Sequence, residues 1–215
     1  MRGDPLTNAI AASSFAFLLT GALALAQSAE PTLKQLRAEA PLHAAALLGA
    51  AAGAAQTAWA PEAWIRLWIG LIALGSGAYN LWALFRVQHS THRDASARWP
   101  EPRTLAGIGL VVGLGSAFSG TGGPLLLLPC LLAGGYSVAR SVRCALAIQV
   151  PIALAATGTH WLAGRLDLAL GFAVAAILVP CAWLGQRLAL RASDRRLRQM
   201  ASSILIGTGL WLVFV

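Results

Sequence analysis

Long apolar runs separated by short polar stretches make up most of this 215-residue sequence. A helix needs about 20 mostly apolar residues to cross a bilayer, and we read the runs as whole or partial spans. In chain order they are residues 8–27, 42–59, 64–85, 104–118, 124–134, 142–163, 168–188 and 200–215. The pattern predicts an all-α polytopic membrane protein.

Composition supports a membrane as the solvent of this chain. Hydrophobic residues account for 57% of it and charged residues for only 11%, whereas soluble domains are about 25% charged. The net charge of +8 would suggest a nucleic-acid partner in a soluble protein. Here the basic residues lie between apolar runs, where membrane proteins carry them. We therefore expect a lipid bilayer as the surroundings and no nucleic acid.

Two neighbouring runs, 104–118 and 124–134, are too short to cross alone. As helices they reach about 22 Å and about 17 Å, against an apolar core of about 30 Å. Between them the chain reads Ser-Gly-Thr-Gly-Gly. Irregular backbone at membrane depth is tolerated only when buried in protein or lining a wet cavity. We expect a re-entrant, short helical hairpin whose Gly-rich turn lies near mid-membrane.

The chain also repeats itself. The stretch TGALAL at 20–25 matches TGTHWL at 157–162, and residues 60–77 run parallel to 192–209. The first three apolar runs therefore mirror the last three.

This repeat predicts the domain organisation. We expect a partial first repeat of about three transmembrane helices at 1–86, a basic cytoplasmic linker at 87–103, and a complete second repeat at 104–215. The second repeat holds the hairpin and about three further helices. The counterpart of the hairpin would lie before residue 1, so the chain either begins inside its first repeat or has its start assigned too late.

The basic residues give the orientation. If the hairpin leaves and returns on one face and every other run crosses once, only Arg2, Arg66 and Arg165 lie outside, and the other thirteen of the 16 basic residues lie inside. That bias follows the positive-inside rule. It also gives the two halves opposite orientations, which is an inverted repeat, an arrangement common among secondary transporters.

A cleaved signal peptide is a second interpretation of the N-terminus. Arg2, the apolar run after it and the Ala-Leu-Ala at 24–26 resemble such a signal. Cleavage would place Gln27 and the basic linker outside, against the charge bias and the repeat. We favour a first membrane span.

The Gly-rich turn is the main candidate site. If a helix begins at Pro124, the N–H groups of Gly122, Gly123 and Leu125 have no partner in a preceding turn and point along the positive end of the helix dipole. Glycine lets a ligand approach the backbone, and nearby hydroxyls add donors. The candidate substrate-binding residues of the turn are Ser116, Ser119, Gly120, Thr121, Gly122 and Gly123. Such a cradle suits an anion; the alternative is that the glycines only let helices pack closely.

Two polar residues of the next run complete the candidate set. Gln149 and His160 lie about 20° apart around a helix and so share a face, with Pro151 predicted to kink the helix between them. Gln149 either lines the path or bonds a neighbouring helix. His160 is either a gate or proton-linked group, or a residue that meets the headgroups.

No metal, cofactor or catalytic group is predicted. The three cysteines, Cys130, Cys144 and Cys181, fit no metal spacing and are expected to pack as small apolar residues. His89 and His92 of the linker are expected to be solvated. The spans hold no paired carboxylates or nucleophile–base pair, so an enzyme lacks support.

Residues 109–142, GLVVGLGSAFSGTGGPLLLLPCLLAGGYSVARSV, resemble the signature of the sulfite exporter TauE/SafE family of membrane transporters. HWLAGRLD at 160–167 resembles the family's His, Gly and Asp at the next external turn, and 185–199 its closing basic segment. Residues 8–86 resemble the first repeat more loosely. Two features depart from the family: Pro124 stands where a third glycine is usual, and the Gly-rich turn of the first repeat is missing.

The resemblance implies a multi-pass secondary transporter of the bacterial inner membrane. It would export sulfite, a sulfonate or a related small anion by alternating access around the Gly-rich helix N-terminus, without a cofactor. Homodimerisation could restore a second turn. The alternative is a truncated, non-transporting homologue that serves as a partner or scaffold.

Overall fold

The computed structural model describes residues 5–27, 33–86, 100–134, 136, 138–189 and 194–214. These ranges contain helices and no strand. The helices are α1 (Pro5–Ala26), α2 (Leu33–Gln56), α3 (Glu62–Arg86), α4 (Pro102–Ser119), α5 (Pro124–Ala133), α6 (Val138–Leu162), α7 (Leu168–Ala189) and α8 (Asp194–Phe214). The all-α prediction is confirmed. Most of the expected linker, with His89 and His92, lies outside the described residues.

Within the described ranges, 3 helical stretches are long and apolar enough to cross a membrane: Pro5–Ala26, Arg140–Leu162 and Leu168–Gly185. Gln199–Phe214 of α8 is a shorter apolar helix. The protein is therefore an all-α membrane protein. The crossings expected of α2, α3 and α8 remain predictions.

Several helices begin earlier than the apolar pattern indicates. α2 starts at Leu33 and passes through Pro41, and it ends at Gln56 rather than at Trp59. α4 starts at Pro102, so the last residues of the expected linker belong to it. Lys, Arg and Glu are good helix formers and proline suits the first helical turn, so α2 and α4 extend past the apolar residues.

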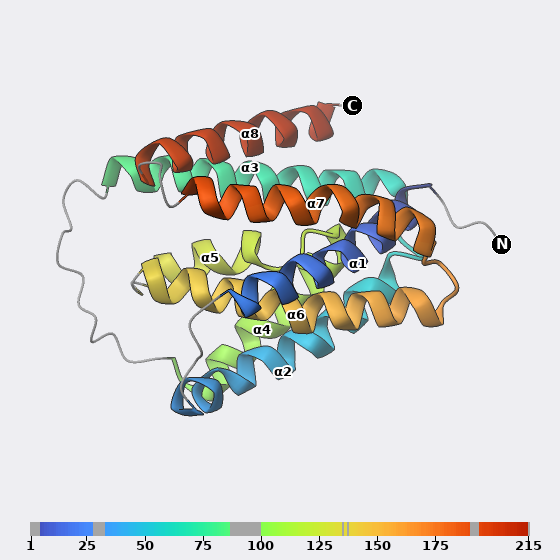
Figure 1. Cartoon of the computed structure of the whole chain (residues 1–215), viewed down its shortest axis with the longest axis horizontal. Coiled ribbons are helices and arrows are strands. Elements are labelled where there is room, and N and C mark those ends of the chain that lie inside the picture. Colours follow the sequence, from blue (N-terminus) through green and yellow to red (C-terminus); the bar gives the residue numbers. More distant parts are fainter. Residues whose placement is uncertain are drawn as a thin grey trace.

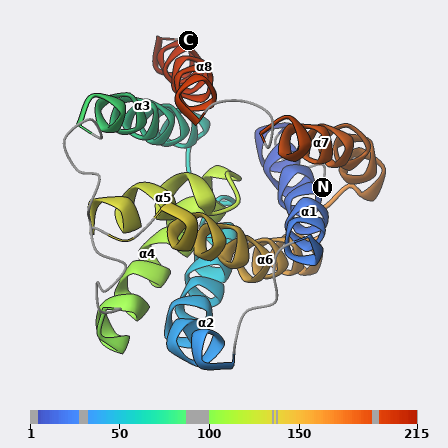
Figure 2. The same ribbon diagram turned by 60° about the vertical axis from the view of Figure 1, so that its left-hand side comes forward.

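The helices form groups around a short central pair. α2 packs on α4, α3 on α8 and α1 on α7, while α6 contacts α1, α2 and α5. In Figure 2 the α3–α8, α2–α4 and α1–α7 pairs lie on three sides of α5 and α6. The short helix α5 therefore reaches into the middle of the molecule.

The neighbours follow the sequence repeat. The repeat equates α1 with α6, α2 with α7 and α3 with α8. α1 packs on α7 as α6 packs on α2, and the equivalent helices α1 and α6, and α3 and α8, pack on each other. These contacts are compatible with a two-fold relation between the halves, and the repeat itself stays a prediction.

Glycines bring the backbones of α2 and α4 into contact. A Cβ atom on Gly113 would lie 2.1 Å from the carbonyl oxygen of Ala46, and one on Gly53 would lie 2.3 Å from that of Leu114. A Cβ atom on Gly49 or Gly109 would approach the backbone of the partner helix equally closely. Small residues spaced four apart allow this approach between membrane helices.

The core is built mainly from small and aliphatic side chains. Ala46, Ala50 and Ala54 of α2 are fully buried in one cluster with Ile148 and Ile152 of α6. By contrast, only 11% of the apolar stretch of α7 is buried within the protein. The outer face of α7 is therefore the kind of surface that lipid chains cover.

Candidate functional site

The Gly-rich turn ends α4 and begins α5. Gly120 adopts the left-handed conformation with φ 68°, and its N–H donates to the carbonyl oxygen of Ser116. The N–H of Thr121 donates to the same oxygen, at 3.0 Å. These bonds close the C-terminus of α4 in the way left-handed glycines do.

The start of α5 leaves backbone donors free. The N–H groups of Leu126 and Leu127 donate to the carbonyl oxygen of Gly123. Those of Gly122, Gly123 and Leu125 have no hydrogen-bond partner in the described part of the chain. The N-terminus of a helix carries roughly half a positive charge, so these N–H groups can bind an anion.

The glycines of the turn are required by conformation and by space. Gly122 has φ 76° and Gly123 has φ 103°, values that side chains disfavour. A Cβ atom would lie 3.1 Å from the ring of Phe17 at Gly122, and 2.8 Å from the Cδ1 atom of Ile152 at Gly123. The space that these glycines open is therefore occupied by side chains of α1 and α6.

These contacts also fix the depth of the turn. Phe17 lies near the middle of α1 and Ile152 near the middle of α6, and both helices are candidate spans. Figure 1 shows the α4–α5 turn beside α1, in the middle of the molecule. The hairpin tip is therefore at mid-height of the spans.

The hydroxyls of the turn have different roles. The Oγ atom of Ser119 lies 2.9 Å from the carbonyl oxygen of Gly115 and 2.9 Å from the Oγ1 atom of Thr121. Ser119 and Thr121 therefore bond within the hairpin. The Oγ atom of Ser116 is fully buried and has no partner among the described residues. Ser116 is the hydroxyl that remains available.

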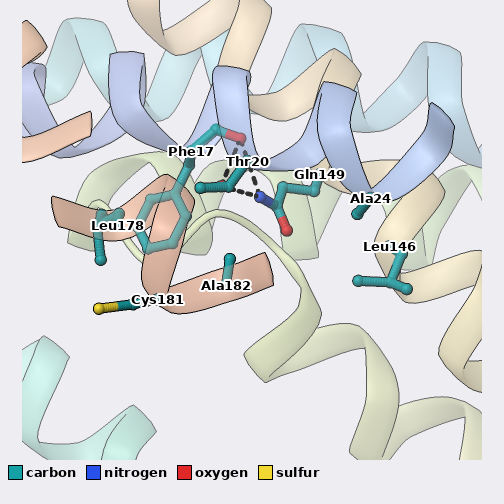
Figure 3. Close-up of a pocket in the computed structure, with 8 residues that line it drawn as sticks. All are labelled: Phe17, Thr20, Ala24, Leu146, Gln149, Leu178, Cys181 and Ala182. Carbon is teal, nitrogen blue, oxygen red and sulfur yellow. Dashed lines mark hydrogen bonds between the residues drawn. The ribbon is translucent and has the colours of Figure 1, made fainter. Parts of the chain in front are cut away.

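Gln149 joins α6 to α1. Its Nε2 atom donates to the carbonyl oxygen of Phe17 at 2.9 Å and to the Oγ1 atom of Thr20 at 3.1 Å. A carbonyl can only accept, so the amide nitrogen must face α1. Figure 3 shows these bonds, with the side-chain oxygen of Gln149 directed away from α1.

A pocket of about 370 Å³ lies where α1, α6 and α7 meet. Its lining residues are Phe17, Thr20, Ala24, Leu146, Gln149, Leu178, Cys181 and Ala182. Gln149 therefore bonds a neighbouring helix and also lines this pocket, and its place on a transport path stays a prediction. Phe17 lines the pocket, and its ring also packs against Gly122.

His160 lies apart from the turn. It is eleven residues beyond Gln149 on α6, which is about 16 Å along a helix. The side chain is fully buried, and neither ring nitrogen has a hydrogen-bond partner in the described ranges. The structure thus brings together the turn and Gln149, but not His160.

The cysteines divide between core and surface. Cys144 is buried in the main apolar cluster, as the sequence predicts. Cys130 and Cys181 are exposed, and all three are free thiols. Among the residues that the structure describes, no group of three or more His, Cys, Asp or Glu side chains is placed to hold a metal ion.

Two side chains of α3 hold the hairpin, and sequence analysis missed both. The Nε1 atom of Trp68 donates to the carbonyl oxygen of Gly115 at 3.2 Å. The Oγ atom of Ser76 donates to the carbonyl oxygen of Leu125 at 2.9 Å. Within α5, the carbonyl of Leu125 would normally bond the N–H of residue 129, but Pro129 has none. Ser76 supplies the missing donor.

The fold and the turn together define a helical membrane protein with a short helical hairpin. The family model described as Sulfite exporter TauE/SafE matches residues 1–212, and the chain belongs to this family. Membership implies a membrane transporter of sulfur anions, with a small anionic substrate, rather than an enzyme. No curated protein and no solved structure matches the chain significantly.

Proposed function

We propose that this chain is a secondary transporter that exports sulfite, a sulfonate or a related sulfur oxyanion by alternating access around the N-terminus of α5. The main support is the set of unpartnered N–H groups at Gly122, Gly123 and Leu125. An oxyanion would give these donors their missing acceptors, and the helix dipole favours its charge. We place the protein in the bacterial inner membrane with multiple crossings.

Neutral donors suit a transporter better than a buried arginine would. Conduction and transport need a site that binds firmly enough for entry and weakly enough for release. Backbone amides and the free hydroxyl of Ser116 meet this need. Discontinuous helices near the bilayer midplane serve this purpose in other secondary transporters.

Access to the turn involves Phe17. Its ring packs against Gly122 and also lines the pocket between α1, α6 and α7. A rotation of this ring away from Gly122 would connect the pocket with the turn. The closed arrangement is then one of the two states that alternating access requires.

Sulfite efflux from loaded proteoliposomes tests the proposal. Gly122→Leu should reduce efflux to the level of empty liposomes, because the side chain meets Phe17 and occupies a left-handed conformation. Gly107→Leu is the matched control, since no atom lies within 4 Å of a Cβ at Gly107. Equal efflux from wild type and Gly122→Leu would remove the turn from the mechanism.

Ser116→Ala separates binding from folding. The Ser116 hydroxyl has no partner in the described chain, so its removal should leave the melting temperature unchanged or higher. A hydrogen bond to a charged ligand is worth about 1.5–3 kcal/mol, so KM for sulfite should rise about tenfold or more. Absence of efflux from wild-type protein would instead favour a non-transporting partner.

A further inference from the structure

Several buried polar atoms near the C-terminal end of α6 have no hydrogen-bond partner among the described residues. Both ring nitrogens of His160, the Oγ1 atom of Thr157 and the Nε atom of Arg165 are buried without a hydrogen-bond partner in the described ranges. Thr157 and His160 lie one turn apart on α6, so they are neighbours on its surface. The backbone N–H of Arg165 donates to the carbonyl oxygen of His160, at 2.9 Å. The backbone of Arg165 therefore lies against the end of α6 that carries Thr157 and His160.

The end of α2 fixes the Arg165 guanidinium. One terminal nitrogen lies 3.1 Å from the Oγ1 atom of Thr57, and the other lies 3.3 Å from the carbonyl oxygen of Ala54. The guanidinium is also close enough to His160 for the two to interact electrostatically. These bonds hold the side chain in place and leave its Nε–H group unused.

The Arg165 guanidinium has no counter-ion among the residues that the structure describes. No carboxylate in the described part of the chain forms an ion pair with Arg165, and burial lowers the pKa of its guanidinium. Asp167, close by in the chain, accepts hydrogen bonds from the N–H groups of Ala169 and Leu170 at the start of α7. The positive charge is thus partly desolvated, and no described carboxylate neutralises it.

These unpartnered donors call for a hydrogen-bond acceptor that carries negative charge. Arg165 offers one N–H group, Thr157 one O–H group and a neutral His160 one ring N–H group. Buried polar groups are normally satisfied, and the exceptions need an explanation. An oxyanion would accept from all three donors and neutralise the arginine.

We propose that Thr157, His160 and Arg165 form a second oxyanion-binding site at the end of α6, which the charge bias places on the outer face. His160 lies about 16 Å along α6 from Gln149, so this site is distinct from the turn. Figure 1 shows the α6–α7 loop at one end of the molecule. The identity of the anion, a sulfur oxyanion, rests on the proposed function. The site receives the anion that leaves the turn.

Calorimetric titration of the detergent-purified full chain with sodium sulfite tests this site. Wild type should bind two equivalents of sulfite. Arg165→Gln should weaken one of them by about 10- to 100-fold, because that bond involves a charged group. Arg66→Gln is the matched control: Arg66 is paired with Glu62 and its loss should change neither equivalent.

Thr157→Val keeps the test valid if Arg165→Gln disturbs the end of α2. The Thr157 hydroxyl has no partner in the described chain, so valine should preserve the melting temperature while weakening the same equivalent about tenfold. Two unchanged equivalents in both variants would mean that water satisfies these donors, and would overturn the proposal.

A turn variant separates this inference from the proposed function. Gly122→Ala should weaken only the other equivalent. If wild type binds one equivalent that Arg165→Gln removes and Gly122→Ala keeps, the outer site stands and the turn site fails. If that one equivalent is lost only in Gly122→Ala, the outer site is wrong. If wild type binds none, both are wrong.

Discussion

Ser76 compensates for a proline on another helix. Its hydroxyl bonds the carbonyl oxygen of Leu125, which Pro129 leaves without the usual helical donor. Ser76→Ala should therefore destabilise the protein by about 1–3 kcal/mol, since an unmade bond to a buried acceptor is costly. Thermal unfolding in detergent measures the loss.

The same pair allows a double-mutant cycle. Pro129→Ala restores an N–H group within α5, so it should recover much of the stability lost in Ser76→Ala. Ser203→Ala is the control, because its exposed hydroxyl bonds only the backbone of its own helix. Equal losses from Ser76→Ala with and without Pro129→Ala would show that Ser76 does not serve the Leu125 carbonyl.

The known geometry of helix ends made some residues of the site predictable from the sequence. The free N–H groups of Gly122 and Gly123 follow from a helix that begins at Pro124. The contact of Phe17 with Gly122 and the bond from Ser76 to Leu125 join distant parts of the chain, 49 residues apart in the second case. No pattern in the sequence predicts such contacts between distant residues.

At the scale of elements, the α2–α4 contact can be tested by replacing glycine with alanine at two positions of α4, where we expect opposite effects. Gly113→Ala places a methyl group 2.1 Å from the carbonyl oxygen of Ala46 and should cost about 1–3 kcal/mol through overpacking. Gly107→Ala, on the same helix but in open space, should be neutral or stabilise by up to about 1 kcal/mol. Thermal unfolding compares them, and equal effects would contradict the close contact.

The sequence contained a signal for this contact. Gly49 and Gly53 are spaced four apart in one apolar run, and Gly109 and Gly113 have the same spacing in another, which indicates close helix packing in membranes. We expected close packing of this kind only at the Gly-rich turn. Helix existence was predictable from the apolar runs, whereas the starts of α2 and α8 were not, because charged residues continue both helices.

At the scale of the whole molecule, the charge bias predicts which end faces outward. In a variant with Cys130, Cys144 and Cys181 replaced by Ala, a membrane-impermeant maleimide should label Ala163→Cys in intact bacterial cells. Ala163 is an exposed residue of the α6–α7 loop. Ser96→Cys, in the basic linker, should react only after permeabilisation. The reverse labelling would favour the opposite orientation.

The hairpin is attached unequally on its two sides, and this limits how the protein can move. On the side of α3, Trp68 and Ser76 each bond a backbone carbonyl of the hairpin. On the side of α1, the contacts are mainly van der Waals, with the Ser13 hydroxyl 3.5 Å from the carbonyl oxygen of Gly120. We expect the hairpin to travel as one body with α3 and with α2, whose backbone contacts that of α4. The contacts that open during a transport cycle are then those between the hairpin and α1.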